Sequence, residues 1–254
     1  MPNMYMNAFK KFYGVVPQGL LHVGAHEAEE AEEYLKYNMS GNERIVWVEA
    51  QSEKVKLLRE KLDPEKNLVL EALIWSKSGV EMELKIASKT ASSSVYEFGL
   101  HKKYYPEIDF VSSRKLLTSR LDEIVPKNQM YEFLVMDVQG AELEVLKSLG
   151  TQISKIKWIF TEVSKLPIYQ GAASYKEVFD YLIAKDFTPK FEAWDKNSGW
   201  GDVLFVRKSI WKFRFLEFLG RRFVRMYYQV YWRIPQRMFP VLVKLKAFFH
   251  FRQN

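Results

Sequence analysis

The chain has 254 residues, a formal net charge of +7 and no cysteine. A chain of this length forms one large domain, or one domain with an appendage. The hydrophobic content of 48% and the charged content of 27% exclude wholesale disorder and a collagen-like or coiled-coil chain. The absence of cysteine from the sequence excludes a disulfide scaffold, a thiolate zinc site and a cysteine nucleophile.

The positive charge is concentrated in the last fifth of the chain. Twelve basic residues and one acid give residues 207–254 a charge of +11, so residues 1–206 carry −4. We therefore predict a domain over residues 1–208 and a basic, aromatic tail over residues 209–254. On a helical wheel the arginines of the tail separate from its leucine and aromatic side chains, which predicts basic amphipathic C-terminal helices.

A basic amphipathic tail is typical of an in-plane anchor on an anionic membrane surface. The start of the chain lacks a signal peptide, and no apolar run is long enough to span a bilayer. We therefore expect a cytoplasmic protein bound peripherally to the inner face of a membrane. A tail packed on the domain or on a partner protein is the alternative. Nucleic acid is a weaker candidate partner, because the rest of the chain is acidic.

The hydropathy pattern predicts strands that alternate with helices along the first 208 residues. Strands are predicted over residues 19–24, 44–49, 67–75, 80–87, 131–137 and 156–163, with a closing antiparallel hairpin over 187–193 and 201–207. Helices are predicted over residues 27–39, 52–62, 141–149 and 174–184, and residues 88–127 are expected to form a long loop. Such alternation is typical of a mostly parallel sheet with helices on both faces, whose ligands bind at the carboxyl ends of the strands.

The ends of the first two strands carry a glycine and an acid. Gly24 ends the first strand, where a residue without a side chain lets a ligand approach the backbone. Glu49 ends the second strand, and a carboxylate there can accept hydrogen bonds from ribose hydroxyls. A tight turn and a helix N-terminal acid are the structural alternatives. Together the two residues favour a bound adenosine.

A third strand end adds Asp137, which follows the apolar run Phe-Leu-Val-Met. A carboxylate at the end of such a run is costly to bury without partners. The structural alternative is a helix N-cap at Asp137 or Gln139. We favour a functional role, because the same edge of the sheet already carries the glycine turn and the acid.

Five blocks of the sequence resemble the FkbM family of S-adenosylmethionine-dependent methyltransferases. They are LLHVGAHEAEE, IVWVEA, FLVMDVQGAELEVLKSLG, IFTEVSKLPIYQG and WGDVLFVRK, which together span roughly residues 18–208. The resemblance implies the class I methyltransferase (Rossmann-like) α/β fold, with a seven-stranded sheet whose last strand is antiparallel. It also implies S-adenosyl-L-methionine as cofactor and O-methylation of a glycan or another hydroxyl-bearing acceptor, such as a lipid-linked saccharide. It requires no metal, and no spacing of His, Asp and Glu indicates a metal site.

The resemblance also implies roles for single residues. Gly24 and Ala25 would face the methionine part of the cofactor, Glu49 the ribose, and Ala72 and Leu73 the adenine. The full set of implied cofactor contacts is Gly24, Ala25, His26, Glu49, Ala50, Ala72, Leu73, Ser93, Ser94, Asp137 and Val138. A poorly acidic hydroxyl needs a general base, and the candidates are Asp137, Glu162 and His101.

Two departures from the family motivate alternatives to an enzyme of this kind. The family usually has Asp where His22 stands and Gly where Ala28 stands. A non-catalytic cofactor-binding module of the same fold is therefore one alternative, and an RNA methyltransferase that uses the basic tail is another. A nicotinamide-dependent enzyme is disfavoured, because no G-x-G-x-x-G follows the first strand.

The stretch over residues 88–127 holds several aromatic and basic side chains. Long loops in compact domains often bind ligands, and this composition suits a sugar or an anionic glycan. The alternative is an ordinary lid whose charges are solvated.

Overall fold

The computed structural model describes residues 16–195 and 198–210. The predicted amphipathic helices of the tail lie outside the described residues. Within these described ranges, no helix is long and apolar enough to cross a bilayer.

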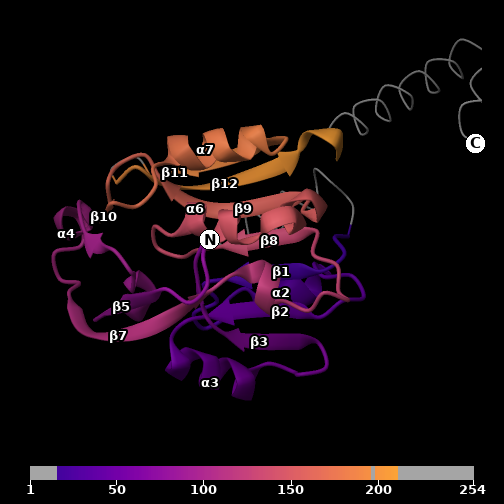
Figure 1. The fold of residues 1–254 in the computed structure, drawn as a ribbon, viewed down its shortest axis with the longest axis horizontal. Coiled ribbons are helices and arrows are strands. Elements are labelled where there is room, and N and C mark those ends of the chain that lie inside the picture. The colour runs from indigo at the N-terminus through magenta and orange to yellow at the C-terminus, as the bar shows by residue number, and fades with distance from the viewer. Residues whose placement is uncertain (1–15, 196–197, 211–254) are drawn as a thin grey trace, which may run out of the picture. The chain divides into compact units, whose positions relative to one another are not determined.

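The central sheet has seven strands in the order β11-β12-β9-β8-β1-β2-β3 (Figure 1). Their bounds are β1 Leu20–Val23, β2 Ile45–Glu49, β3 Asn67–Glu71, β8 Phe133–Met136, β9 Trp158–Ser164, β11 Phe187–Trp194 and β12 Trp200–Arg207. The five strands from β9 to β3 are parallel, whereas β12 runs antiparallel to both β9 and β11. The predicted α/β sheet with an antiparallel last strand is confirmed.

Helices connect the parallel strands. They are α2 Ala31–Lys36, α3 Ser52–Lys61, α5 Leu121–Ile124, α6 Glu142–Ser148 and α7 Tyr175–Ala184. The best capped is α7, where Ser174 accepts a hydrogen bond from the Glu177 backbone and the Glu177 carboxylate accepts one from the Ser174 backbone. The helix predicted over 27–39 is wrong in its first turn, because Ala28 has a φ of +49° and the helix starts only at Ala31.

The loop predicted over residues 88–127 is also wrong, because much of it is ordered secondary structure. Its largest element, β7 (Phe110–Ser119), pairs antiparallel with β5 (Glu81–Ala87) and parallel with β4 (Leu73–Ile74) in a second sheet (Figure 1). The other elements in this range are α5, already described, with η1 Thr90–Ser92, β6 Glu97–Phe98 and α4 His101–Tyr104, and β6 pairs with β10 (Tyr169–Gln170). The strand predicted over 67–75 is split accordingly, since β3 ends at Glu71 and β4 belongs to the second sheet.

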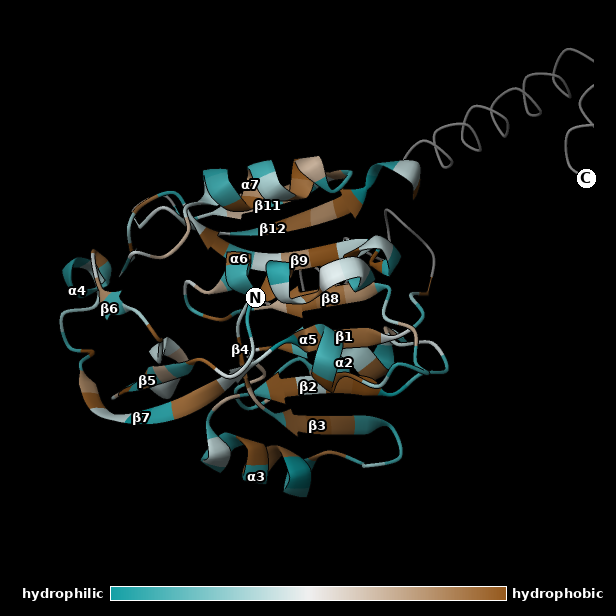
Figure 2. Cartoon of the chain, viewed as in Figure 1, coloured by the Kyte–Doolittle hydropathy of each residue, from teal (hydrophilic) through white to brown (hydrophobic). Residues whose placement is uncertain are grey.

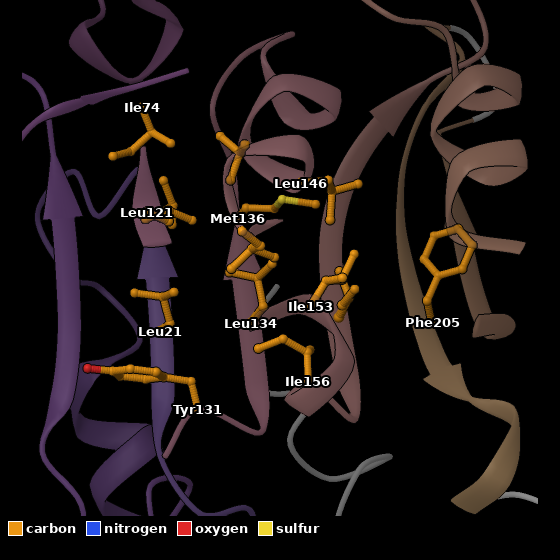
Figure 3. Packing of buried hydrophobic residues seen from close by; sticks show 14 of the residues in the cluster. Leu21, Ile74, Leu121, Tyr131, Leu134, Met136, Leu146, Ile153, Ile156 and Phe205 are labelled. Carbon is orange, nitrogen blue, oxygen red and sulfur yellow. The ribbon is translucent and has the colours of Figure 1, made fainter. Parts of the chain in front are cut away.

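The core lies between the central sheet and its helices. Figure 2 shows the central strands as predominantly hydrophobic, and every residue of β1, β2 and β8 is buried. Figure 3 shows Leu21, Leu134 and Met136 from the sheet packed against Leu146 of α6 and Ile153 of η2 (Gly150–Lys155). Burial of one such side chain stabilises the fold by about 1.5–3 kcal/mol. This packing fixes the carboxyl ends of β1, β2, β8 and β9 relative to one another.

Candidate active site

The turn after β1 depends on Gly24. Its φ is +82°, and a Cβ at this position would lie 1.8 Å from the backbone oxygen of Asp137. The backbone N–H groups of Gly24 and Ala25 both donate to the oxygen of Val48, at 2.9 and 3.1 Å. Glycine is therefore required here because the turns after β1 and β8 touch, and this contact brings Asp137 beside the turn.

Glu49 at the end of β2 is the group that organises this turn. Its Oε2 accepts from the backbone N–H of His26 at 2.8 Å, and its Oε1 accepts from those of Ala50 and Gln51 at 2.9 and 2.8 Å. A carboxylate has about four lone-pair sites, so one acceptor site on Oε2 remains. The side chain is 6% exposed, which means that this site is pre-positioned and reached only through the adjoining pocket.

A pocket at the strand ends collects the predicted cofactor contacts. It encloses about 710 Å³ of space, part of it open to solvent. We call it the strand-end pocket. Of the implied contacts it is lined by Gly24, His26, Glu49, Ala50, Ala72, Leu73, Ser93, Ser94, Asp137 and Val138. Ala25 is buried in the turn behind the pocket and is not among the lining residues.

Two side chains hold the segment around Thr90 over this pocket. The His26 ring makes a hydrogen bond between Nε2 and the Thr90 hydroxyl at 2.9 Å, and Gln51 Nε2 donates to the Thr90 backbone oxygen at 3.2 Å. Sequence reasoning missed Gln51 and Thr90 as lining residues. Gln51 lies just beyond the end of β2, but the separation of 39 residues between it and Thr90 leaves no local signal of their contact.

His22, the first departure from the family, is a core residue. It is 3% exposed, its ring stacks on Trp47 with centroids 5.0 Å apart, and its Nδ1 lies 3.2 Å from the Tyr34 hydroxyl. Burial lowers the pKa of His22 to about 4, so the ring is neutral near pH 7. Side chains alternate between the faces of a strand, so His22 packs on the face opposite to Leu21 and is not among the residues that line the strand-end pocket.

Two of the predicted bases meet at the side chain of Gln139. Its Nε2 donates to Asp137 Oδ1 at 2.5 Å and lies 3.5 Å from Glu162 Oε1. Desolvation, followed by repulsion from Asp202, raises the pKa of Asp137 to about 6, although the hydrogen bond from Gln139 opposes this rise. Desolvation and the negative charge of Asp137 raise the pKa of Glu162 well above its usual range. The pKa of Asp137 is therefore shifted toward neutral pH, the direction that favours a general base.

His101, the third candidate base, is placed elsewhere by the structure. It has no exposed surface, its ring stacks on Phe98 with centroids 4.1 Å apart, and it contacts Tyr169 and Trp200 edgewise or tilted. Burial lowers the pKa of His101. It does not line the strand-end pocket, nor a second pocket described below that Glu162 lines. Its position is that of a packing residue behind an aromatic layer.

The basic side chains of residues 88–127 are largely paired with acids. Lys102 lies 2.6 Å from Asp109, Lys115 lies 2.9 Å from Glu81, and Arg114 and Arg120 pair with Glu53 and Asp122. These pairs reduce the charge available to an anionic glycan. Over the described ranges, no group of three or more acidic or histidine side chains is arranged to hold a metal ion.

The sheet order, the antiparallel β12, the glycine turn after β1 and the acid at the end of β2 define a class I methyltransferase fold. The chain belongs to the methyltransferase FkbM domain family, whose model matches residues 22–189. The predicted family and fold are confirmed, and with them S-adenosyl-L-methionine as the cofactor of this domain.

Two individual proteins illustrate the relationship. The 2-O-methyltransferase NoeI of Sinorhizobium fredii (strain NBRC 101917 / NGR234) is 26% identical over 102 residues, which is 39% of this chain and 42% of that protein. The crystal structure of methyltransferase FkbM from Methylobacillus flagellatus KT is similar with a TM-score of 0.50 and 14% identity, over 81% of this chain and 50% of the other. The matches therefore span half or less of each relative's length.

Proposed function

We propose that this protein transfers a methyl group from S-adenosylmethionine to a hydroxyl group of a sugar, within a glycan or a lipid-linked saccharide. The observation that carries the proposal is the position of Asp137. Its carboxyl is open to the strand-end pocket, and through Gln139 it adjoins Glu162 at the end of a neighbouring strand. The turn after β8 thus carries the candidate base and also lines the pocket proposed for the methyl donor.

The strand-end pocket fits the cofactor by the chemistry of its lining. Glu49 keeps one acceptor site for a ribose hydroxyl, and the apolar side chains of Leu73, Ile74 and Val138 suit the faces of an adenine ring. The turn at Gly24 and Ala25 would lie beside the methionine part. When bound, the cofactor supplies a methyl group on a sulfonium, whose carbon–sulfur bond breaks as the acceptor oxygen bonds to the methyl carbon.

The chain's own contribution is to position the acceptor and to remove a proton. A sugar hydroxyl is weakly acidic, so the reaction gains from a base that accepts its proton as the new bond forms. Asp137 is the candidate for this role, with its pKa raised to about 6. The name of the relative, a 2-O-methyltransferase, supports an oxygen acceptor. Positioning in a shared site supplies the remainder of the rate.

Cofactor binding and product formation test the proposal separately. Titration calorimetry with S-adenosylmethionine should show binding that Glu49→Ala weakens about 10- to 150-fold, since a hydrogen bond to a charged group contributes about 1.5–3 kcal/mol. Glu60→Ala, which removes an exposed acid from α3, is the matched control. Transfer of labelled methyl groups to a panel of sugars should then give product. No binding at millimolar cofactor, or binding without product on any sugar, would refute the activity.

The composition of the tail indicates where in the cell the proposed enzyme works. Residues 207–254 carry a net charge of +11 with many aromatic residues, a composition that suits an anionic membrane surface. We propose on this basis that the enzyme works at the inner face of a membrane, where lipid-linked saccharides are presented.

A further inference from the structure

A second cavity opens on the other side of the turn that follows β8. It encloses about 560 Å³ of space, part of it open to solvent. The residues that line it include Gly140, Glu142, Glu162, Lys165, Tyr169 and Trp200. We call it the Trp200 pocket. No catalytic candidate except Glu162 lines it, and the sequence motifs did not predict it.

Gln139 contacts residues that line both pockets. It has a φ of +50°, and its backbone oxygen accepts from the Ser94 hydroxyl at 2.7 Å. Its side-chain Oε1 lies 2.7 Å from the Tyr169 hydroxyl, and its Nε2 holds Asp137. The Gln139 side chain therefore links Asp137, which lines the strand-end pocket, to Tyr169, which lines the Trp200 pocket.

The Trp200 pocket offers a rigid aromatic surface. Trp200 is partly exposed and packs against Tyr105 and His101, with ring centroids 5.6 and 5.7 Å apart. His101 in turn stacks on Phe98. An indole held from behind in this way is a large apolar face that loses little conformational freedom when a ligand packs on it. The C–H face of a sugar ring is a ligand that suits it.

The polar lining of this pocket favours hydroxyl or ammonium groups over anions. Glu142 and Glu162 both line it, and desolvation, together with the Asp137 charge, raises the pKa of each of them. A cation stabilises the ionised form of these carboxyl groups, and a hydroxyl can donate a hydrogen bond to either form, whereas an anion beside them opposes their ionisation further. Lys165 is the one basic residue among the lining residues, and its ammonium lies 3.6 Å from the centre of the Trp194 ring. An anionic ligand would have to draw it away from that ring.

We infer that the Trp200 pocket is the acceptor site, and that it selects an uncharged or amino sugar over an anionic one. This inference rests on the proposed function for the reaction, and it adds the place of the acceptor and its charge class. Trp200 supports the sugar ring, the two glutamates receive hydroxyl or ammonium hydrogens, and the reacting hydroxyl points past Gln139.

Saturation-transfer NMR on the full chain with bound S-adenosylhomocysteine tests the site without turnover. The probes are glucose, glucosamine, glucuronic acid and glucose 6-phosphate. We expect signals from glucose and glucosamine, and affinities at least tenfold lower for the two anions. Trp200→Leu should reduce sugar binding at least tenfold, while Trp75→Leu, which removes an indole that lines neither pocket, should leave it unchanged. Equal affinity for the anionic probes would overturn the selectivity.

A second variant, which fills the pocket, tests the site independently in case Trp200→Leu fails to fold. Ala172 lines the pocket beside Gly140, and Ala172→Phe should fill this space while calorimetry shows unchanged cofactor affinity. Sugar binding that survives both substitutions would overturn the assignment of the pocket. The failure of the proposed function looks different: sugar binding would still be lost in both variants, but the wild-type protein would methylate no sugar.

Discussion

The substitution Gln139→Leu isolates the control that one side chain exerts over the proposed base. Gln139 Nε2 donates to Asp137 Oδ1 at 2.5 Å and thereby stabilises the ionised carboxylate. Leucine is one atom shorter and has no donor, so it leaves Asp137 with the desolvation and the neighbouring acids that already raise its pKa to about 6. The acids and the histidine that act on Asp137 are Glu162, Glu142, Asp202, Glu30 and His26.

The expected shift follows from the strength of that hydrogen bond. A bond to a charged group contributes about 1.5–3 kcal/mol, and solvent in the open pocket reduces this to the order of 1.4 kcal/mol, or about one pKa unit. The base must be ionised to act, so the acidic limb of the kcat/KM profile should move to higher pH by about one unit. With the pKa moving from about 6 to about 7, activity should fall about fivefold at pH 6 and hardly at all at pH 8.

The assay is the pH dependence of kcat/KM with a sugar acceptor, paired with carbon NMR of the aspartate carboxyls in the absence of acceptor. Gln170→Leu is the matched control, because this exposed glutamine lies outside both pockets. Tyr169→Phe should give a smaller shift, since it frees the amide without removing the donor to Asp137. An acidic limb that stays in place, or moves to lower pH, would refute the role of Gln139.

Three further predictions concern stability and location. Gly24→Ala should lower the melting temperature by many degrees in a calorimetric scan. The reason is that the new Cβ would lie 1.8 Å from the backbone oxygen of Asp137, at a φ of +82°. A change of less than one degree would show that the turn can adjust. His22 has a pKa of about 4 when folded and about 6.5 when unfolded, so stability should fall by up to about 3 kcal/mol as the pH drops from 6.5 to 4. Urea unfolding at both ends of this range should show that His22→Gln loses most of this dependence, and an unchanged slope would assign it to other groups. Deletion of residues 209–254 should abolish sedimentation with anionic vesicles, and binding that persists would place the membrane contact elsewhere.

The central sheet and the main features of the site were predictable because they follow from local patterns. Each parallel strand is a short apolar run, and the residues that carry the site come directly after such runs, as Gly24, Glu49 and Asp137 do. In a parallel sheet these ends meet at one edge whatever the connecting segments do. The register of β1 with β2 and β8 then places the three residues around a single pocket.

The elements that escaped prediction have no such pattern. Most residues of β7 are exposed or half-buried and its middle is polar, so neither alternation nor an apolar run marks it as a strand. The left-handed φ of Ala28, +49°, is set by the turn that Glu49 holds and not by alanine itself. Gln51, Thr90 and the Trp200 pocket depend on contacts between distant segments, which hydropathy cannot reveal.

The two departures from the family bear differently on whether this site can bind its cofactor. An acid at position 22 would normally order the glycine turn, yet here the His22 ring is turned into the stack with Trp47 and Tyr34. The turn is ordered instead by Glu49, which holds the His26 backbone directly. That carboxylate also keeps a free acceptor site, which is the one that we propose for a ribose hydroxyl. Loss of the acid at position 22 therefore does not by itself imply loss of the cofactor. Ala28 differs, because it stands at a φ of +49°, which favours the glycine usual in the family, and it is the departure that still supports the non-catalytic alternative.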